Sequence, residues 1–162
     1  MNTLIVYESI HHKNTEKVTM RIARILNAKV TKPENIDTSE FEEYQLIGFG
    51  SGIYWGKHSA KILQLVDGIS RVEGKKAFIY STSGLRPLPI FHDFNKPLQD
   101  KLLAKGFEII GVFSCRGYDS NGLLRLFGGI NKGRPSEKDL AEAEKFAEKI
   151  KEKIKGVSHS SP

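Results

Sequence analysis

Three polar stretches of this chain carry residue types that bind phosphate groups and flat rings, and each follows an apolar run. The first ends at the start of a helical pattern, and its candidate binding residues are Ser9, His11, His12, Lys13, Asn14 and Thr15. Loop amides, hydroxyls and the unpaired N–H groups of a helix N-terminus together form a common anion site. The alternative is a polar loop that only caps the helix, since Asn14 or Thr15 suits a cap position. Neither GxxxxGK[ST] nor GxGxxG occurs here, which argues against a nucleoside triphosphatase or a dinucleotide fold.

The second stretch, residues 50–58, places Tyr54 and Trp55 among glycines, a setting in which an aromatic side chain can stack on a flat ring. The alternative is that one or both aromatics pack against the helix that follows. The third stretch, residues 81–84, offers hydroxyls and amides to the edge of such a ring. A phosphate site, a stacking aromatic and an amide-rich edge together predict FMN as the ligand. The further candidate binding residues are Ser51, Gly52, Ile53, Tyr54, Trp55, Thr82, Ser83, Gly84 and Gly117.

The elements that must position these stretches alternate between strands and helices. Apolar runs predict buried strands at residues 3–7, 45–51, 75–82 and 107–114, with a shorter strand at 28–31. Helical patterns cover residues 15–27, 59–69 and 97–105, and a last helix starts at Ser136 with Asp139 placed to complete its cap. This alternation predicts an α/β fold, with a parallel sheet and helices on both of its faces. In such a sheet the ligand lies outside the C-terminal strand ends, where all three stretches fall.

Length and composition predict one domain over residues 1–156 and a frayed tail over 157–162. The single cysteine, Cys115, excludes an internal disulfide and any Cys-rich metal site, and it is expected to be a small buried or semi-buried filler rather than a nucleophile. No apolar run is long enough to cross a bilayer, and the N-terminus does not resemble a signal peptide. These features favour a cytoplasmic location. The net charge of +6 admits nucleic acid, a membrane surface or an acidic protein as a partner.

The chain resembles the flavodoxin family. The residues YES…NTE from Tyr7 to Glu16 are similar to the family's phosphate loop, and GSGIYW at 50–55 is similar to its first flavin-flanking loop. Within the family the chain looks most like small prokaryotic members with an SxHHxNT loop and a GGINKGRP stretch, here residues 128–135. The resemblance covers nearly the whole chain. It implies a flavodoxin-like three-layer sandwich, a five-stranded parallel sheet of order 2-1-3-4-5, noncovalent FMN and electron transfer.

The charges depart from that family, whose members are typically acidic around the flavin. His11, His12 and Lys13 stand where the family keeps a compact, neutral loop. We expect a basic rim around the site or, alternatively, scattered solvated charges. Such a rim would favour the reduced, anionic flavin and attract acidic redox partners such as a ferredoxin, whereas no motif points to nucleic acid. The basic rim comprises His11, His12, Lys13, Lys57, His58, Lys61, Arg86, Arg116, Arg125, Lys132 and Arg134.

Three functions remain open. The first is an FMN-binding electron carrier, which needs no catalytic acid or base. The second is an FMN-dependent oxidoreductase of quinones or other small acceptors, similar to protoporphyrinogen oxidase or to NAD(P)H reductases. The third is a flavin-free module that binds phosphate or protein. The sequence predicts no catalytic residue and no metal ligand in any of them.

Overall fold

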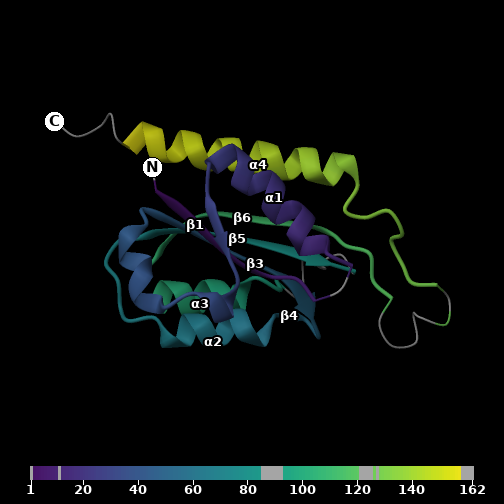
Figure 1. Cartoon of the computed structure of the whole chain (residues 1–162), viewed down its shortest axis with the longest axis horizontal. Helices are drawn as coiled ribbons and strands as arrows, with labels where there is room; N and C mark the ends of the chain where they lie inside the picture. The colour runs from purple at the N-terminus through teal and green to yellow at the C-terminus, as the bar shows by residue number, and fades with distance from the viewer. Residues whose placement is uncertain (1, 11, 85–92, 121–125, 127, 158–162) are drawn as a thin grey trace.

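The structure is a computed structural model that describes residues 2–10, 12–84, 93–120, 126 and 128–157. Its main strands and helices alternate along the chain, and two short 3-10 helices lie between β2 and β3 (Figure 1). The elements are β1 (Thr3–Glu8), α1 (Asn14–Leu26), β2 (Lys29–Thr31), η1 (Pro33–Asn35), η2 (Thr38–Glu43), β3 (Leu46–Tyr54), β4 (Lys57–His58), α2 (Ala60–Gly68), β5 (Lys76–Ser83), α3 (Lys96–Ala104), β6 (Glu108–Arg116) and α4 (Glu137–Val157).

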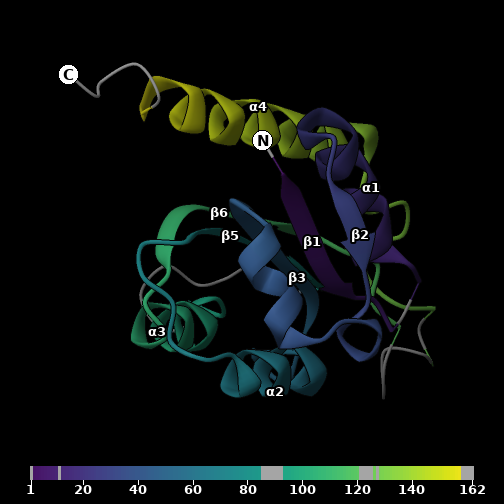
Figure 2. The same cartoon turned by 60° about the vertical axis from the view of Figure 1, so that its left-hand side comes forward.

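The strands form one parallel sheet in the order β2-β1-β3-β5-β6. Helices α1 and α4 cover one face, while α2 and α3 cover the other (Figures 1 and 2). The predicted three-layer α/β fold and its strand order 2-1-3-4-5 are therefore confirmed. The short strand β4, which pairs antiparallel with the end of β3, was not predicted.

Alternate residues of each strand point to opposite faces of the sheet. Their apolar side chains therefore form two clusters, one on each face, and these clusters pack the helices onto the sheet. In β5, Ile79 joins the cluster beneath α2 and α3, whereas Phe78 and Tyr80 join the cluster beneath α1 and α4. The Tyr80 ring lies against the backbone of β3, and a Cβ atom added to Gly50 would approach it to 2.0 Å. Glycine is therefore required at position 50 by a close approach inside the sheet.

Two differences from the predicted elements affect the candidate site. Strand β3 extends to Tyr54, so the expected loop at 50–58 is a strand end and a tight hairpin. Its turn residues, Trp55 and Gly56, have φ values of 53° and 77°, as the two-residue turns that match the twist of a hairpin require. Helix α1 begins at Asn14 after a left-handed Lys13, and no side chain caps it, so the expected cap by Asn14 or Thr15 is wrong.

The last helix is capped as predicted. The Ser136 N–H donates to Asp139 Oδ2 at 2.7 Å, and the Asp139 N–H donates to Ser136 Oγ at 3.3 Å. Helix α4 is described to Val157, and the rest of the expected tail lies outside the described residues. Among the helices that the structure describes, none is long and apolar enough to span a membrane.

Candidate functional site

A pocket opens at the C-terminal edge of the sheet, where the three polar stretches meet. Its lining includes these predicted residues: Asn14, Thr15, Gly52, Ile53, Tyr54, Thr82, Ser83, Gly84 and Gly117. Tyr118 and Asp119 also line it, and both follow Gly117 just beyond the end of β6. Asp119 was not selected as a binding residue from the sequence, and its position after Gly117 is the signal that could have found it. Parallel strand ends thus gather residues that lie up to about a hundred positions apart in the chain.

The N-terminus of α1 forms one end of the pocket. The first helical backbone bond runs from the Lys17 N–H to the Lys13 carbonyl at 3.0 Å, so the preceding N–H groups have no partner within the helix. Thr15 Oγ1 lies 2.9 Å from Thr82 Oγ1, and this hydroxyl pair joins the first stretch to the third. The arrangement presents unpaired N–H groups and their partial positive charge to a bound anion.

Two polar atoms of the first stretch are buried without a hydrogen-bond partner among the described residues. They are Ser9 Oγ and Asn14 Oδ1. Asn14 is only 8% exposed, and its Nδ2 donates to the Tyr118 carbonyl at 2.8 Å. Buried polar atoms of folded proteins are seldom left unpaired. Ser9 can therefore supply a donor to a ligand, while Asn14 Oδ1 can accept a hydrogen bond from one.

The side chains of His12 and Lys13 contact other residues of the protein. His12 Nε2 lies 2.7 Å from Ser120 Oγ, and the His12 ring packs on Tyr118 with a centroid separation of 4.2 Å. Lys13 is exposed, and its Nζ lies 3.7 Å from Glu16 Oε1. His12 and Lys13 both have left-handed backbones, with φ values of 53° and 54°, which glycine adopts with less strain. His11, the remaining predicted ligand here, lies outside the described residues.

The β3–β4 hairpin forms a second wall of the pocket. Trp55 is fully exposed at its tip, so it does not pack against α2. Tyr54 folds back over Gly52, and its hydroxyl accepts a hydrogen bond from the Ile10 N–H at 3.2 Å. Burial raises the pKa of Tyr54, with smaller contributions from Glu8 and Asp119. The hairpin therefore presents one free aromatic ring and one that is fixed to the first stretch.

Ser51 and His58 belong to the interior rather than to the pocket or the basic rim, and both expectations are corrected here. Neither is more than 3% exposed. His58 Nδ1 lies 2.8 Å from Ser51 Oγ, and Nε2 lies 3.0 Å from Asn95 Oδ1. Because Asn95 Oδ1 can only accept, Nε2 carries the proton and Nδ1 is the unprotonated nitrogen. The single hydroxyl proton of Ser51 faces both Nδ1 and the Gly52 carbonyl oxygen, each 2.8 Å from Oγ. Burial lowers the pKa of His58 to about 4, so the ring is neutral.

This chain of hydrogen bonds continues across the sheet. Asn95 Nδ2 donates to Ser114 Oγ at 2.9 Å, and Ser114 Oγ lies 2.8 Å from Ser81 Oγ. A hydroxyl, an imidazole and an amide in succession have the order of a hydrolytic triad. Ser51 has no exposed surface, however, and no substrate can reach it. The chain instead holds the hairpin, α3 and two strands together beneath the pocket.

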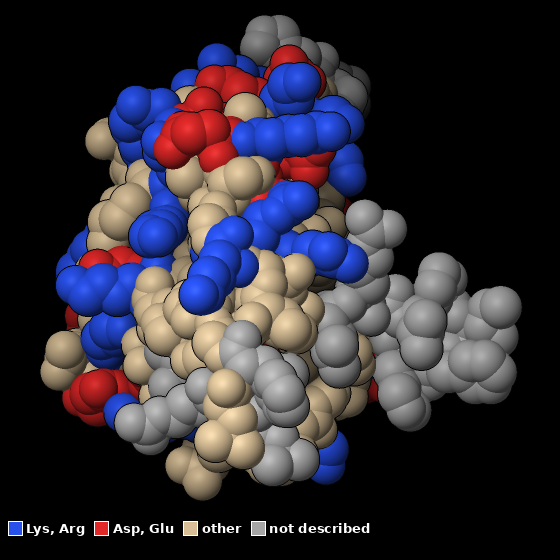
Figure 3. Space-filling view, turned by 90° about the vertical axis from the view of Figure 1, so that its right-hand side faces the viewer, with Lys and Arg blue, Asp and Glu red and all other residues tan. Residues whose placement is uncertain are grey.

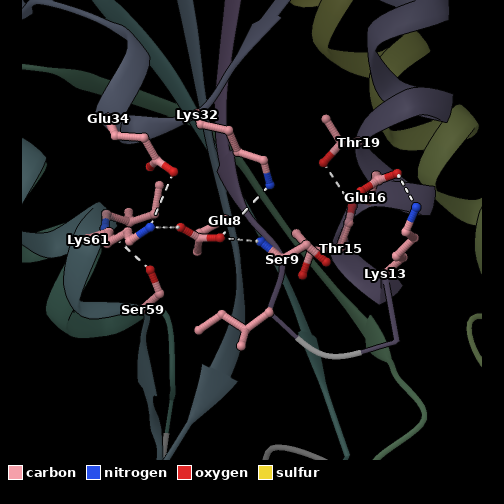
Figure 4. A network of polar contacts seen from close by, with 12 residues as sticks. Glu8, Ser9, Lys13, Thr15, Glu16, Thr19, Lys32, Glu34, Ser59 and Lys61 are labelled. Carbon is pink, nitrogen blue, oxygen red and sulfur yellow. Dashed lines mark hydrogen bonds and ion pairs between the residues drawn. The ribbon is translucent and has the colours of Figure 1, made fainter.

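A second polar cluster lies behind the first stretch (Figure 4). The buried Glu8 carboxylate accepts from the Ser9 N–H at 3.1 Å through Oε1. Lys61 Nζ lies 3.3 Å from Glu8 Oε2 and 3.2 Å from Glu34 Oε1, while Lys32 Nζ lies 3.9 Å from Glu8 Oε1. Hydrogen bonds to Glu34 and then to Glu8 raise the pKa of Lys61. Both ammonium groups are directed at the Glu8 carboxylate (Figure 4), and the Lys61 side chain is 56% exposed whereas that of Glu8 is 9% exposed.

Among the described residues, several cations of the basic rim form ion pairs. Lys13, Lys61 and Arg134 form ion pairs, while Arg86 and Arg125 lie outside the described residues. Lys57 and Lys132 are exposed and have no ion pair among the residues that the structure describes. Viewed from this edge, most of the visible Lys and Arg lie above and to the left of an uncharged area, with Asp and Glu among them (Figure 3). Asp119 is the only Asp, Glu, Lys or Arg among the described residues that line the pocket, so no Lys or Arg among these residues lines it.

Cys115 is partly buried, as expected, and packs against the cluster beneath α1 and α4. Burial raises the pKa of its thiol to about 12. A thiol with this pKa holds its proton at neutral pH and is a poor nucleophile.

Comparison with known proteins gives two likenesses at the level of sequence. Residues 4–114 match a family model described as a flavodoxin domain. An uncharacterised protein of Methanocaldococcus jannaschii is 50% identical over 150 residues, and the match covers 93% of this chain and 98% of that protein. The matched residues include the ends of β1, β3 and β5, which contribute to the pocket.

Solved structures show the same fold at low sequence identity. A flavodoxin from the domain Archaea is 18% identical with a TM-score of 0.69, and the match covers 96% of this chain and 99% of that one. Oxidised flavodoxin 2 from Bacillus cereus is 18% identical with a TM-score of 0.72, covering 94% and 99%. The rubredoxin oxygen:oxidoreductase of Desulfovibrio gigas is 16% identical with a TM-score of 0.73, and the match covers 98% of this chain but 37% of that one.

Proposed function

The chain belongs to the flavodoxin family, and on that premise we propose that it binds FMN noncovalently at the pocket and carries electrons. The pair of unpartnered atoms beside the α1 N-terminus supports this proposal most strongly. Ser9 Oγ is a hydroxyl that can donate to a phosphate oxygen, and Asn14 Oδ1 requires a donor from the ligand. A phosphate on a polyol chain supplies both partners, as the ribityl phosphate of FMN does. An apolar ligand would leave both atoms unsatisfied.

In this proposal, different residues around the pocket bind different parts of FMN. The flavin ring supplies the redox chemistry when FMN is bound. The N-terminus of α1 and Ser9 hold the phosphate, and the hydroxyls and amides of residues 82–84 face the ring edge. Trp55 provides an aromatic face for stacking. Asp119 lines the pocket, and its carboxylate would oppose the build-up of negative charge on a flavin bound there.

Electron transfer to acidic proteins forms the second part of the proposal. Lys57 and Lys132 are exposed to solvent, and Lys61 is more exposed than the Glu8 that it pairs with. An approaching acidic partner therefore meets ammonium groups first, which favours its encounter with this edge. We place the protein in the cytoplasm as part of the same proposal.

Flavin titration tests the proposed ligand. Titration with FMN, followed by the fluorescence of the free flavin, is expected to show saturable quenching. Riboflavin should bind more weakly than FMN because it lacks the phosphate. In the Ser9→Ala variant the difference in affinity between FMN and riboflavin should be smaller than in the wild type. A protein that takes up neither flavin would not be a flavoprotein and would fit the flavin-free module instead.

Turnover measurements separate the carrier from the enzyme. A carrier loaded with FMN should pass electrons to an acidic ferredoxin, at a rate that falls as the salt concentration rises. Rapid steady-state turnover of NAD(P)H or a quinol with a small acceptor would instead show an FMN-dependent oxidoreductase.

A further inference from the structure

A single asparagine far along the chain joins two walls of the pocket. Asn131 lies between β6 and α4, and its Nδ2 donates to the Gly84 carbonyl at 2.5 Å. The same nitrogen lies 3.4 Å from the Gly117 carbonyl oxygen, and Asn131 Oδ1 accepts from Arg116 Nη1 at 3.4 Å. Gly84 and Gly117 both line the pocket, each just beyond the end of its strand. One side-chain amide thus spans the ends of two neighbouring strands.

The backbone around Asn131 holds this amide in place. Asp119 and Ile130 exchange two backbone hydrogen bonds, of 3.0 and 2.7 Å, and the Arg134 N–H donates to the Asn131 carbonyl at 3.0 Å. Asn131 has a φ of 60°, a left-handed conformation that asparagine adopts more readily than most other residues. The position therefore suits an asparagine both in its backbone and in its side chain.

The two walls that Asn131 joins approach each other closely. A Cβ atom added to Gly84 would lie 2.6 Å from both Cβ and Oδ2 of Asp119. Asn131 donates to the Gly84 carbonyl on one wall, while its neighbour Ile130 pairs with Asp119 on the other. Loss of the Asn131 amide would remove a hydrogen-bond donor from the Gly84 and Gly117 carbonyls. The Asn131 side chain would then no longer join the two walls.

We propose that Asn131 is a positioning residue that sets the shape of the pocket at its ring end. None of the hydrogen bonds made by Asn131 reaches Ser9 or the α1 N-terminus, where the phosphate is expected to bind. Asn131 should therefore control the affinity for the flavin ring and leave the contribution of the phosphate unchanged. The inference rests on the proposed function only for the identity of the ligand.

Two variants separate the side chain from the backbone. Asn131→Gly keeps the left-handed conformation and removes the amide. Asn131→Asp keeps the size of the side chain but cannot donate to the two carbonyls. Lys138→Ala is the matched control, since Lys138 is exposed in the first turn of α4 and has no ion pair among the described residues. Thermal unfolding of each variant verifies that it remains folded.

The dissociation constants for FMN and riboflavin are then measured for each variant, together with the visible circular dichroism of the bound flavin. Both Asn131 variants should weaken both flavins by at least about fivefold and by the same factor, because a buried carbonyl loses its donor. The visible dichroism should change, and Lys138→Ala should match the wild type. Affinities of Asn131→Gly within about twofold of the wild type, or a loss confined to FMN, would overturn the proposal.

The outcome remains separable from that of the proposed function. If the wild type takes up no flavin, the proposed function fails, and amide hydrogen exchange of the free protein decides the role of Asn131. Its side-chain amide should then exchange much more slowly than that of the exposed Asn35, and Asn131→Gly should speed backbone exchange at Gly84 and Gly117. Equal exchange of the two side chains, or unchanged exchange at both glycines, would overturn the positioning role.

Discussion

Acid should destabilise this protein through a single buried imidazole. The folded state holds His58 neutral, because burial lowers its pKa to about 4 from an ordinary value of 6.5. The unfolded chain takes up a proton near pH 6.5, whereas the folded protein does so only near pH 4. Stability due to His58 is therefore fully present above pH 6.5 and is lost as the pH falls towards 4. Between about pH 7.5 and pH 5 the loss should be about 2 kcal/mol.

Urea unfolding of the wild type and of His58→Gln across this pH range measures the effect. Glutamine cannot titrate, and it retains an amide that can donate to Asn95. The variant should be less stable than the wild type near pH 7.5, and the gap should close by about 2 kcal/mol at pH 5. Every other titrating group is common to both proteins and cancels in the difference. A gap that stays constant with pH, or an NMR titration of His58 with a pKa above 6.5, would refute the assignment of a buried neutral ring.

Three further predictions concern other residues. Trp55→Ala should weaken FMN binding by about 1–3 kcal/mol if its ring stacks on the flavin, and an unchanged affinity in a flavin titration would remove Trp55 from the site. Lys13→Gly should raise the free energy of unfolding by about 1 kcal/mol, because glycine adopts the left-handed backbone of this position with less strain. Lys17→Gly, within α1, should lower the free energy of unfolding by a similar amount. Lys75→Met should lower it by about 1–3 kcal/mol, because Lys75 Nζ donates to three carbonyls, those of Phe41, Glu42 and Tyr44; an unchanged urea midpoint would contradict this.

The sequence predicted the layers of the fold because burial imposes a period on apolar residues. Strand interiors such as 3–7 and 75–82 are apolar because both faces of the sheet are covered. The gathering of three stretches at one edge followed from the parallel order of the strands. The pocket therefore contains most of the residues that were expected at a binding site.

The residues that sequence reasoning misplaced are those whose partners lie far away in the chain. Gly50 and Gly52 suggested a loop, but they lie within β3, where the rings of Tyr80 and Tyr54 need the space. His58 suggested a surface charge, but Asn95, 37 residues later, pairs with it in the interior. Asn131 lies 47 residues from the Gly84 carbonyl that it contacts. No local pattern encodes such contacts, because they arise only when the sheet assembles.

NMR mapping with isotope-labelled protein tests FMN binding at this pocket most directly. Addition of FMN should shift the backbone amides of residues 9–16, 52–55, 82–84 and 117–119, and the shifts should saturate at one FMN per chain. Inorganic phosphate should shift only the first of these groups. The absence of saturable shifts, or shifts centred on residues away from the C-terminal edge of the sheet, would contradict FMN binding at the pocket.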